Sequence, residues 1–386
     1  MIGAVPWDGL LDQARLIAKC GGPVVPEEAV SLADLAVTGP DEIFTVSRAV
    51  TRPTGGVLMS SGGTTGRPKL TFVAYHQAID RLLAQWRPLD TGDLLLNLFT
   101  PGRLWASHYY MQALAQRCGS DVAPFGPIGP DEVAEWLPLL RRLRVNAVAG
   151  TPTALADLAR GVLDAGGRTP IEKIIWMAEP WTEEKETVVR AAFDQVRLWG
   201  NYGSVETYVI ATSTPACGTS VLHLMPDQVL EPDDGGALLS RVGDGWTVPT
   251  VRYRLGDRVA AARCGCGRSD GLRVLGRADD AIKLGGALVG IGTVLAVVKG
   301  EPGVRDAQLV LARAAGERHS VSKLTVHFTG EATVDAVRRR LLHQFYDLGV
   351  IARHEPDAVA VERVDRLHRV ERTNKIPPMV WLEQVA

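Results

Sequence analysis

The chain has 386 residues, of which 46% are hydrophobic and 22% charged, and these proportions are typical of an ordinary globular protein. A chain of this length is longer than one hydrophobic core usually serves, so two domains are predicted. The formal net charge of −2 offers no basic surface for nucleic acid. No run of 18 apolar residues and no leader pattern are found, so we expect a cytoplasmic protein without a membrane anchor.

The first structural signal along the chain is a pair of apolar runs at residues 57–59 and 70–75. They predict two strands joined by a loop rich in Gly, Ser and Thr. Helical apolar spacing, with acidic residues in the first turn, then predicts a helix over residues 131–145. A second helix is predicted over residues 151–167, with Thr151 as its N-terminal cap.

Strands and helices then alternate, which predicts a sheet covered by helices. Strands are expected at residues 146–150, 173–180 and 196–203, with a helix over residues 181–196. Beyond about residue 280 the pattern indicates a smaller unit. Its expected elements are strands at residues 307–314 and 322–330, a helix over residues 333–349 and a last strand at residues 357–364.

The loop between the first two strands, "LMSSGGTTGRPKL" at residues 58–70, is the clearest candidate for chemistry. Its backbone N–H groups and hydroxyls can converge on one point, and Lys69 adds a positive charge, a combination that suits phosphate oxygens. A P-loop is excluded because Pro68 precedes Lys69 and no helical segment follows. The alternative is a hairpin loop that binds nothing.

Three further motifs follow in order, "NYGSVET" at residues 201–207, "YRLGD" at 253–257 and "LGRADDAIKLGG" at 275–286. With the loop, they resemble the adenylate-forming superfamily of acyl-CoA ligases, luciferases and peptide-synthetase adenylation domains, and most closely its phenylacetate-CoA ligase branch. The resemblance extends from about Thr54 to the C-terminus. It implies an α/β fold with a large N-terminal domain of helix-covered sheets and a small mobile α+β C-terminal domain.

The implied domains are residues 1–278, which would bind nucleotide and acid and have a truncated N-terminus, and residues 279–386, a lid. Asp279 would be the hinge between them. The trimmed N-terminal part would expose apolar surface that a homodimer would cover. Gly285 and Gly286 would let a pantetheine arm approach the backbone.

The resemblance also implies residue roles. Tyr202 would stack on adenine, Asp257 would accept the ribose hydroxyls and Arg277 would lie near ribose and phosphate. Glu206 would hold Mg²⁺. The full set of implied ATP-binding residues is Ser61, Gly62, Gly63, Thr64, Thr65, Gly66, Lys69, Ala178, Glu179, Pro180, Asn201, Tyr202, Gly203, Asp257 and Arg277.

Lys375, in "VDRLHRVERTNKIPP", matches the closing motif of the superfamily, whose lysine reaches the α-phosphate and the acyl carboxylate. A compact ammonium there would stabilise the charge that grows on phosphate. The chain has only eight lysines among its 42 basic residues, and Lys69, Lys283 and Lys375 all fall in superfamily motifs. Asn374 replaces the usual glycine of the closing motif.

Val205 is a second departure, because relatives place Thr or Ser there to donate a hydrogen bond to phosphate. Losing such a bond would cost roughly 1.5–3 kcal/mol unless another group replaces it. Thr207 or a hydroxyl of the phosphate loop are the expected replacements; otherwise adenylation would be slow.

Three cysteines and one histidine form a candidate metal site: Cys217, His223, Cys264 and Cys266. Three thiolates and one imidazole match a closed tetrahedral structural zinc site. The alternative is three buried thiols and a core histidine. Cys20 and Cys118 are expected to be ordinary core residues.

For the acid pocket, the resemblance points to Trp105, His108 and Tyr109, and places "MAEPW" (residues 177–181) between nucleotide and acid. Aromatic walls with few charges favour an aryl acid over an amino acid. His108 is equally compatible with a satisfied core histidine.

These observations predict an enzyme that uses ATP and Mg²⁺ to convert a carboxylic acid into an acyl-adenylate and pyrophosphate, and then transfers the acyl group to CoA. A carrier-protein thiol, an amine or a hydroxyl are alternative acceptors. A nucleotide-binding protein without turnover is the alternative of a different class, and a zinc-ribbon interaction module is the weakest.

Overall fold

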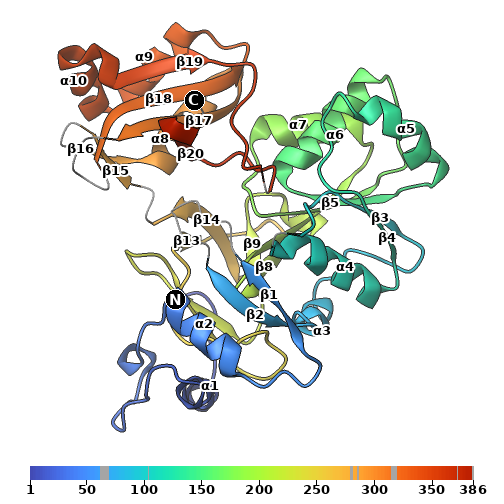
Figure 1. The fold of residues 1–386 in the computed structure, drawn as a ribbon, viewed down its shortest axis with the longest axis vertical. Helices are drawn as coiled ribbons and strands as arrows, with labels where there is room; N and C mark the ends of the chain where they lie inside the picture. The colour runs from blue at the N-terminus through green and yellow to red at the C-terminus, as the bar shows by residue number, and fades with distance from the viewer. Residues whose placement is uncertain are drawn as a thin grey trace. The chain divides into compact units, whose positions relative to one another are not determined.

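A computed structural model describes residues 1–60, 69–102, 104–278, 281–284, 287–313, 320–371 and 373–384 (Figure 1). By their internal contacts these residues form two units. The first unit comprises residues 1–181 and 186–275, and the second comprises residues 182–185 and 276–386. Each unit has its own hydrophobic core. Within the described ranges, no helix has the length and apolar character needed to cross a membrane.

The first unit begins with helices that the sequence patterns did not indicate. They are α1 (Trp7–Lys19), the 3-10 helix η1 (Leu32–Asp34) and α2 (Pro40–Ala49). The hairpin of β1 (Gly56–Ser60) and β2 (Leu70–Ala74) follows, and the short helix α3 (Ile79–Leu83) comes after it. β1 and β2 pair antiparallel. The prediction that the Gly/Ser/Thr stretch joins two strands is therefore confirmed.

A nine-stranded sheet with the order β13-β14-β9-β8-β7-β6-β5-β3-β4 forms the centre of the first unit (Figure 1). The strands from β4 to β7 are parallel, and β8, β9 and β14 continue the sheet antiparallel. The strands are β3 (Leu94–Asn97), β4 (Asp121–Pro124), β5 (Ala147–Gly150), β6 (Lys173–Met177), β7 (Arg197–Ser204), β8 (Tyr208–Ser213), β9 (Leu222–Leu224), β13 (Asp257–Ala261) and β14 (Gly271–Arg277). The connecting helices are α4 (Ala106–Cys118), α5 (Val133–Arg142), α6 (Pro152–Asp164) and α7 (Glu183–Ala192).

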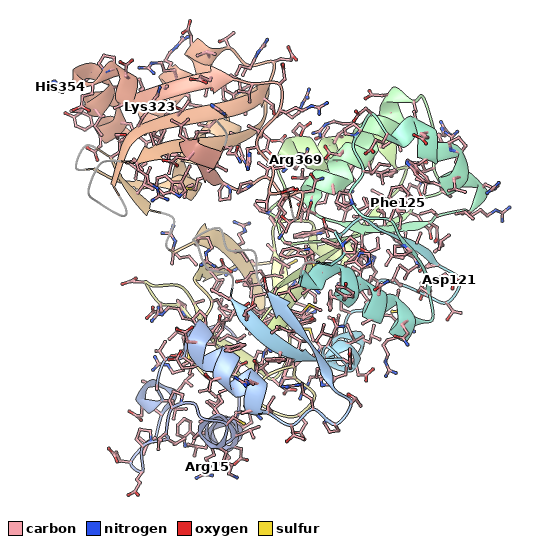
Figure 2. The ribbon with its side chains drawn as sticks, in the orientation of Figure 1. Arg15, Asp121, Phe125, Lys323, His354 and Arg369 are labelled. Atoms are coloured by element: carbon pink, nitrogen blue, oxygen red, sulfur yellow. The ribbon has the colours of Figure 1, made fainter. Side chains whose placement is uncertain are left out.

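Local sequence explains several of these elements. All four residues of β5 are buried, as expected for a parallel strand covered on both faces. The predicted cap of α6 is confirmed, because the Thr151 hydroxyl accepts a hydrogen bond from the Ala154 N–H at 3.2 Å and Pro152 is the first helical residue. Phe125, labelled in Figure 2, follows β4 and packs edge-on against Trp136 of α5 with 4.8 Å between ring centroids.

A separate three-stranded antiparallel sheet, with the order β10-β11-β12, completes the first unit. Its strands are β10 (Gln228–Glu231), β11 (Leu238–Arg241) and β12 (Tyr253–Arg254), and the 3-10 helix η2 (Pro215–Cys217) precedes them. Strands this short give almost no periodic signal, and the sequence analysis identified none of them.

The second unit is an α+β domain whose sheet has the order β16-β15-β18-β17-β20, with β19 also paired to β18. Figure 2 labels Lys323 in β18 and His354 at the end of α10. Its elements are β15 (Ala281–Leu284), β16 (Ala287–Gly290), α8 (Ile291–Lys299), β17 (Val304–Arg313), β18 (Ser320–Gly330), α9 (Val334–Gln344), α10 (Tyr346–His354), η3 (Pro356–Ala358), β19 (Val359–Arg363), β20 (Met379–Trp381) and η4 (Leu382–Gln384).

Two predictions for this unit are wrong. The single helix expected over residues 333–349 is two helices, because Phe345 has φ −113° and ψ 95°, which no α-helix accommodates. The strand at residues 357–364 is not the last, because β20 pairs parallel to β17. The predicted fold class, helix-covered sheets in a large unit with a smaller α+β unit, is confirmed.

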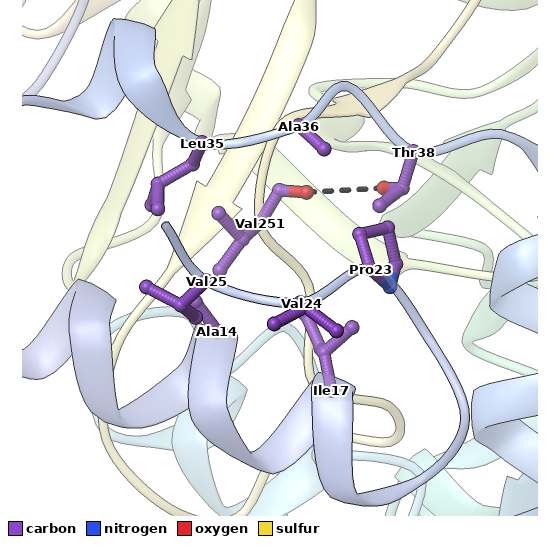
Figure 3. Close-up of a pocket in the computed structure, with 9 residues that line it drawn as sticks. All are labelled: Ala14, Ile17, Pro23, Val24, Val25, Leu35, Ala36, Thr38 and Val251. Atoms are coloured by element: carbon purple, nitrogen blue, oxygen red, sulfur yellow. Dashed lines mark hydrogen bonds between the residues drawn. The ribbon is translucent and has the colours of Figure 1, made fainter. Parts of the chain in front are cut away.

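A small pocket near the N-terminus is lined by aliphatic side chains of α1, residues 23–25 and residues 35–36, together with Thr38 and Val251 (Figure 3). The Thr38 hydroxyl donates to the Val251 carbonyl at 3.0 Å. None of its lining residues carries a charge, so it provides no group for phosphate or carboxylate.

Candidate active site

The hairpin between β7 and β8 contains the "NYGSVET" motif and has an unusual backbone. The pairing register shifts between Tyr202 and Gly203, and Tyr208 has a positive φ of 56°. A side chain at position 203 would collide with the Tyr208 carbonyl, so glycine is required there. Tyrosine at a positive φ is strained, and such strain often occurs at functional sites.

Glu206 lies at the tip of this hairpin and is 3% exposed. Its Oε1 accepts a hydrogen bond from the Tyr253 hydroxyl at 2.6 Å, and Lys69 Nζ lies 3.6 Å from the same oxygen. Among the described residues, its buried Oε2 has no hydrogen-bond partner. A buried carboxylate oxygen is costly unless something compensates it, and carboxylate oxygen is the ligand that Mg²⁺ prefers. Glu206 therefore fits a metal ion.

A second contact joins the same two motifs. The Tyr202 hydroxyl donates to Asp257 Oδ2 at 2.8 Å. Tyr253 and Asp257 are the first and last residues of "YRLGD", so that segment binds the hairpin at two points four residues apart. The structure thus brings together Lys69, Tyr202, Glu206 and Asp257, which the resemblance had assigned to one ATP site from three separate motifs.

Asn201 is anchored by α4. Its Nδ2 donates to the Tyr110 hydroxyl at 2.6 Å, and the Tyr110 ring packs edge-on against Tyr208 at 5.6 Å. Burial raises the pKa of the Tyr110 hydroxyl well above its ordinary value, so that hydroxyl is neutral. Asn201 is 4% exposed, so this bond fixes the hairpin rather than leaving a polar group for solvent.

The "MAEPW" segment follows β6 at the carboxyl end of the parallel strands. Ala178 has a positive φ of 76° and is exposed, and Pro180 is also exposed. Glu179 Oε2 accepts hydrogen bonds from the Thr153 N–H at 3.1 Å and the Thr153 hydroxyl at 2.6 Å, at the N-terminus of α6. A carboxylate is favourable at a helix N-terminus, so Glu179 ties this segment to α6.

Thr207 does not replace the hydroxyl that Val205 lacks. Thr207 is fully buried, and its Oγ1 lies 2.8 Å from Ser204 Oγ inside the hairpin and donates to the Tyr208 carbonyl. Val205 packs against an apolar cluster of the first unit. The remaining expected replacement, a hydroxyl of the phosphate loop, lies outside the described residues.

The predicted acid-pocket residues lie at the start of α4. Trp105 and His108 are buried, whereas Tyr109 is 36% exposed. His108 Nδ1 lies 2.7 Å from the Phe99 carbonyl, so one ring nitrogen is already hydrogen-bonded within the fold. This contact holds His108 in place whether or not His108 lines an acid site.

Other predicted residues lie in the second unit or outside the described ranges. Arg277 ends β14 and is half-buried. Lys375 lies in a tight turn in which the Val370 N–H donates to the Lys375 carbonyl at 2.8 Å and the Asn374 N–H donates to the Val370 carbonyl at 2.7 Å. The residues outside the described ranges are Ser61, Gly62, Gly63, Thr64, Thr65, Gly66, Asp279, Gly285 and Gly286.

The four predicted metal ligands converge in the first unit. One ligand atom of each of Cys217, His223, Cys264 and Cys266 lies within 4.8 Å of the other three. Cys266 Sγ is 3.2 Å from His223 Nε2. The cluster joins η2 and β9 to the turn between β13 and β14, so it links two segments of one end of the nine-stranded sheet.

Asp270, which the sequence analysis missed, supports this cluster. His223 Nδ1 lies 2.8 Å from Asp270 Oδ1, and Arg268 Nη2 donates to Asp270 Oδ2 at 2.5 Å. Metal-bound histidines usually have such a carboxylate on the second ring nitrogen, which orients the first nitrogen toward the metal. The only sequence signal was an acidic residue shortly after the last cysteine, and nothing local links it to His223.

Comparison with known proteins adds three findings. Residues 49–264, more than half of the chain, match the family model described as AMP-binding enzyme. The indoleacetate–lysine synthetase of Pseudomonas savastanoi is 25% identical over 248 residues, and the match spans 62% of each chain. The chain therefore matches less than two thirds of the length of this curated relative.

Among solved structures, a 2-hydroxyisobutyryl-CoA ligase in complex with an acyl-adenylate superposes with a TM-score of 0.68 at 16% identity, covering 98% of this chain and 87% of that one. ATP-bound MatB from Rhodopseudomonas palustris superposes with a TM-score of 0.56 at 17% identity, covering 84% of this chain and 67% of that one. At these identities the similarity demonstrates a shared fold.

Proposed function

This chain belongs to the AMP-binding enzyme family, and from that premise we propose that it activates an aromatic carboxylic acid as its acyl-adenylate and transfers the acyl group to an acceptor. The predicted adenylate-forming superfamily is confirmed. Its phenylacetate-CoA ligase branch stays a prediction.

The observation that supports this proposal most is the constellation around Glu206. A buried carboxylate with one unpartnered oxygen among the described residues lies next to Lys69, and the Tyr202–Asp257 pair lies on the same two segments. Adenylation needs groups that neutralise phosphate charge beside groups that bind the nucleoside, and these residue types supply both.

In the proposed reaction, a carboxylate oxygen of the acid attacks the α-phosphorus of ATP, the bond to the pyrophosphate oxygen breaks, and acyl-adenylate and pyrophosphate result. Tyr202 offers an aromatic face to adenine, and Asp257 accepts hydrogen bonds from the ribose. Lys69 and Lys375 supply positive charge for the phosphate oxygens. Mg²⁺, held by Glu206, would neutralise further phosphate charge.

The acid is proposed to be aromatic because aromatic residues line the start of α4, where Trp105, His108 and Tyr109 follow one another closely. The Pseudomonas savastanoi relative is named for indoleacetate, which is an aryl acid. Glu179, the acidic residue of the "MAEPW" segment, is already bonded to Thr153, which favours an acid without an ammonium group over an amino acid.

CoA is the proposed acceptor, supported by the structural similarity to a CoA ligase. The second candidate is an amine, supported by the name of the curated relative, a lysine synthetase. A carrier-protein thiol and a hydroxyl remain alternatives from the sequence analysis.

The test is pyrophosphate release from ATP and Mg²⁺ with a panel of aryl and aliphatic acids. We expect release with aryl acids, and at least a hundredfold slower release in Glu206→Gln, about the effect of removing one preorganised electrostatic group. Glu172→Gln, which changes an exposed glutamate directly before β6, is the matched control and should match the wild type. Tight ATP binding with no release from any acid would instead identify a silent nucleotide-binding protein.

Acceptors are then compared in the presence of the best acid. Mass spectrometry of the product distinguishes a CoA thioester from a lysine amide. A thioester with CoA alone supports the first candidate, and an amide formed without CoA supports the second and overturns the first.

We also propose that Cys217, His223, Cys264 and Cys266 bind one structural Zn²⁺. All four positions of a tetrahedral site would be filled by protein, so the ion would stabilise the fold and activate no water. Purified protein should contain about one zinc per chain. Cys266→Ser should lose the metal and melt at a lower temperature, whereas Cys20→Ser, outside the cluster, should retain it. Wild-type protein without zinc after expression in zinc-supplemented medium would contradict the proposal.

The cytoplasmic location and the homodimer stay predictions. Cell fractionation and sedimentation equilibrium would test them.

A further inference from the structure

The position of Glu206 depends on how β8 is held, because Glu206 comes two residues before the start of that strand. The strained Tyr208 lies between Glu206 and the regular part of β8. Strain of this kind persists only where surrounding contacts enforce it. The contacts on the first carbonyls after Tyr208 therefore help to determine where the Glu206 carboxylate points.

Two buried side chains from the three-stranded sheet bind those carbonyls. Arg241 of β11 donates from Nη2 to the Val209 carbonyl at 3.2 Å. Gln228 of β10 donates from Nε2 to the next carbonyl, that of Ile210, at 2.8 Å. The two side chains are joined to each other, because Arg241 Nε donates to Gln228 Oε1 at 2.9 Å.

The third strand of the same small sheet contributes Tyr253, whose hydroxyl binds Glu206 directly at 2.6 Å. Each strand of the sheet β10-β11-β12 thus contributes one buried side chain to the hairpin. Gln228, Arg241 and Tyr253 are each at most 1% exposed. A sheet that serves only as a cover would present apolar side chains, and these three polar groups are costly to bury without a specific set of partners.

Of these three side chains, Arg241 is the most costly to bury, because it is charged. No carboxylate lies within ion-pair distance of its guanidinium in the part of the chain that the structure describes, and its positive charge instead lies 4.3 Å from the Trp246 ring centroid. Burial, with a smaller contribution from Arg81, lowers its pKa to about 9, so it stays protonated at neutral pH. Burying a charge without an ion-pair partner costs free energy. Only the planar guanidinium of an arginine can donate to the Gln228 side chain and the Val209 carbonyl at the same time.

We propose that Arg241 and Gln228 are positioning residues that hold the start of β8 so that the Glu206 carboxylate is presented to a metal ion. The inference rests on the proposed role of Glu206 in binding Mg²⁺. It adds two residues that lie outside the nucleotide motifs to those that form the site.

The experiment compares two identical substitutions on the two guanidinium groups that contact Trp246. Arg241→Lys keeps the charge and loses the planar fork of donors. Arg81→Lys alters the other guanidinium, which bonds Asp227 and the Asp244 carbonyl and, within the described residues, forms no hydrogen bond with β8. Pyrophosphate release is measured over a range of Mg²⁺ concentrations at saturating ATP, and melting temperature is measured separately.

For Arg241→Lys we expect the Mg²⁺ concentration for half-maximal rate to rise roughly tenfold, the effect of one lost hydrogen-bonding group that orients a charged ligand. For Arg81→Lys, a partly exposed ion pair, the value should stay within about twofold of the wild type. Gln228→Glu keeps the acceptor for Arg241 and removes the donor to the Ile210 carbonyl, so it should also raise the Mg²⁺ concentration for half-maximal rate. It provides a second variant if Arg241→Lys fails to fold.

A lower melting temperature with an unchanged Mg²⁺ requirement in both Arg241→Lys and Gln228→Glu would overturn the inference and leave a purely structural role. Wild-type activity decides the proposed function independently. If the wild type releases no pyrophosphate, calorimetric titration with ATP at low and high Mg²⁺ replaces the rate. Equal Mg²⁺ enhancement of ATP binding in wild type and Arg241→Lys would then overturn the inference.

Discussion

Asn374 lies in the left-handed region with φ 54° and immediately precedes Lys375. Superfamily members usually have glycine there, and Asn is the side chain that most readily replaces glycine in this conformation. The departure noted in the sequence therefore preserves the backbone of the turn, and the Val370–Lys375 hydrogen bond closes it. An alanine at position 374 would also be small, but it adopts the left-handed conformation less readily than asparagine does.

Val205 differs, because its environment is apolar. Its side chain packs against a cluster that includes Tyr208 and Val209, so a valine is stabilised there by burial. Thr207 and Ser204 bond to each other within the hairpin. The hairpin thus uses its hydroxyls to form its own turn.

The two tyrosine hydroxyls of the site should affect different ligands. Tyr253→Phe removes the donor to Glu206 and is expected to raise the Mg²⁺ requirement for pyrophosphate release roughly tenfold. Tyr202→Phe removes the donor to Asp257 and is expected to raise the KM for ATP instead. Each variant is the other's control, and a result in which both change the same parameter would contradict the assigned roles.

At the level of elements, a charged network around the buried Lys173 and Asp93 fixes the starts of three parallel strands. Lys173, at the start of β6, donates to Asp90 and Asp93 at 2.7 Å each, and Asn146, before β5, donates to Asp93 at 2.8 Å. Asp93 directly precedes β3. The network therefore sets the register of β3, β5 and β6 at the end of the sheet opposite to the "MAEPW" segment.

The network shifts the pKa values of its members in opposite directions. Burial would raise the pKa of the Asp93 carboxyl, but hydrogen bonds from Lys173, the Asp90 N–H and Asn146 outweigh it and hold that pKa below its ordinary value. Burial would lower the pKa of Lys173, but Asp90 and Asp93 raise it. Asp93 stabilises the fold above its unfolded pKa of about 4, and this stabilisation is lost as the pH falls through its folded pKa. Lys173 stabilises the fold below its unfolded pKa of about 10, and this stabilisation is lost as the pH rises through its folded pKa.

We therefore expect Lys173→Met to lower the free energy of unfolding by about 3 kcal/mol at pH 7, because the buried Asp93 carboxylate loses its cation, whereas the exposed Asp90 adds little. The loss should shrink as the pH falls toward 4, where Asp93 can take up a proton in the variant. Urea unfolding at several pH values measures this. Arg197→Met, which breaks an exposed ion pair on β7, is the control and should cost no more than about 0.5 kcal/mol at any pH.

For the molecule as a whole, the proposal assigns roles to residues of both units. Glu206 and its partners belong to the first unit, and Lys375 belongs to the second, whose core is built from α8, β17, β18 and α9. The roles of residues 1–278 as the binding domain and 279–386 as a lid stay proposals, as does the hinge at Asp279.

Lys375→Ala is expected to lower the rate of pyrophosphate release by at least a hundredfold, because a charge that acts on the transition state is removed. The melting temperature, measured separately, shows whether the variant stays folded. Lys323→Ala is the matched control, since it removes a lysine from β18 of the same unit, and should leave the rate unchanged. Equal rates in Lys375→Ala and wild type would remove Lys375 from the proposed mechanism.

The sequence by itself determined the alternation of strands and helices, the α6 cap, the strand–loop–strand setting of the Gly/Ser/Thr stretch and the four motifs, because each is encoded over a few consecutive residues. Only the tertiary structure decided which side chains of these motifs contact one another. The Tyr202–Asp257 and Tyr253–Glu206 bonds join residues 55 and 47 positions apart. The contact of Asp270 with His223, and those of Arg241 and Gln228 with β8, also join residues that are distant in sequence. Contacts between distant residues depend on strand order and burial, and no local periodicity encodes either.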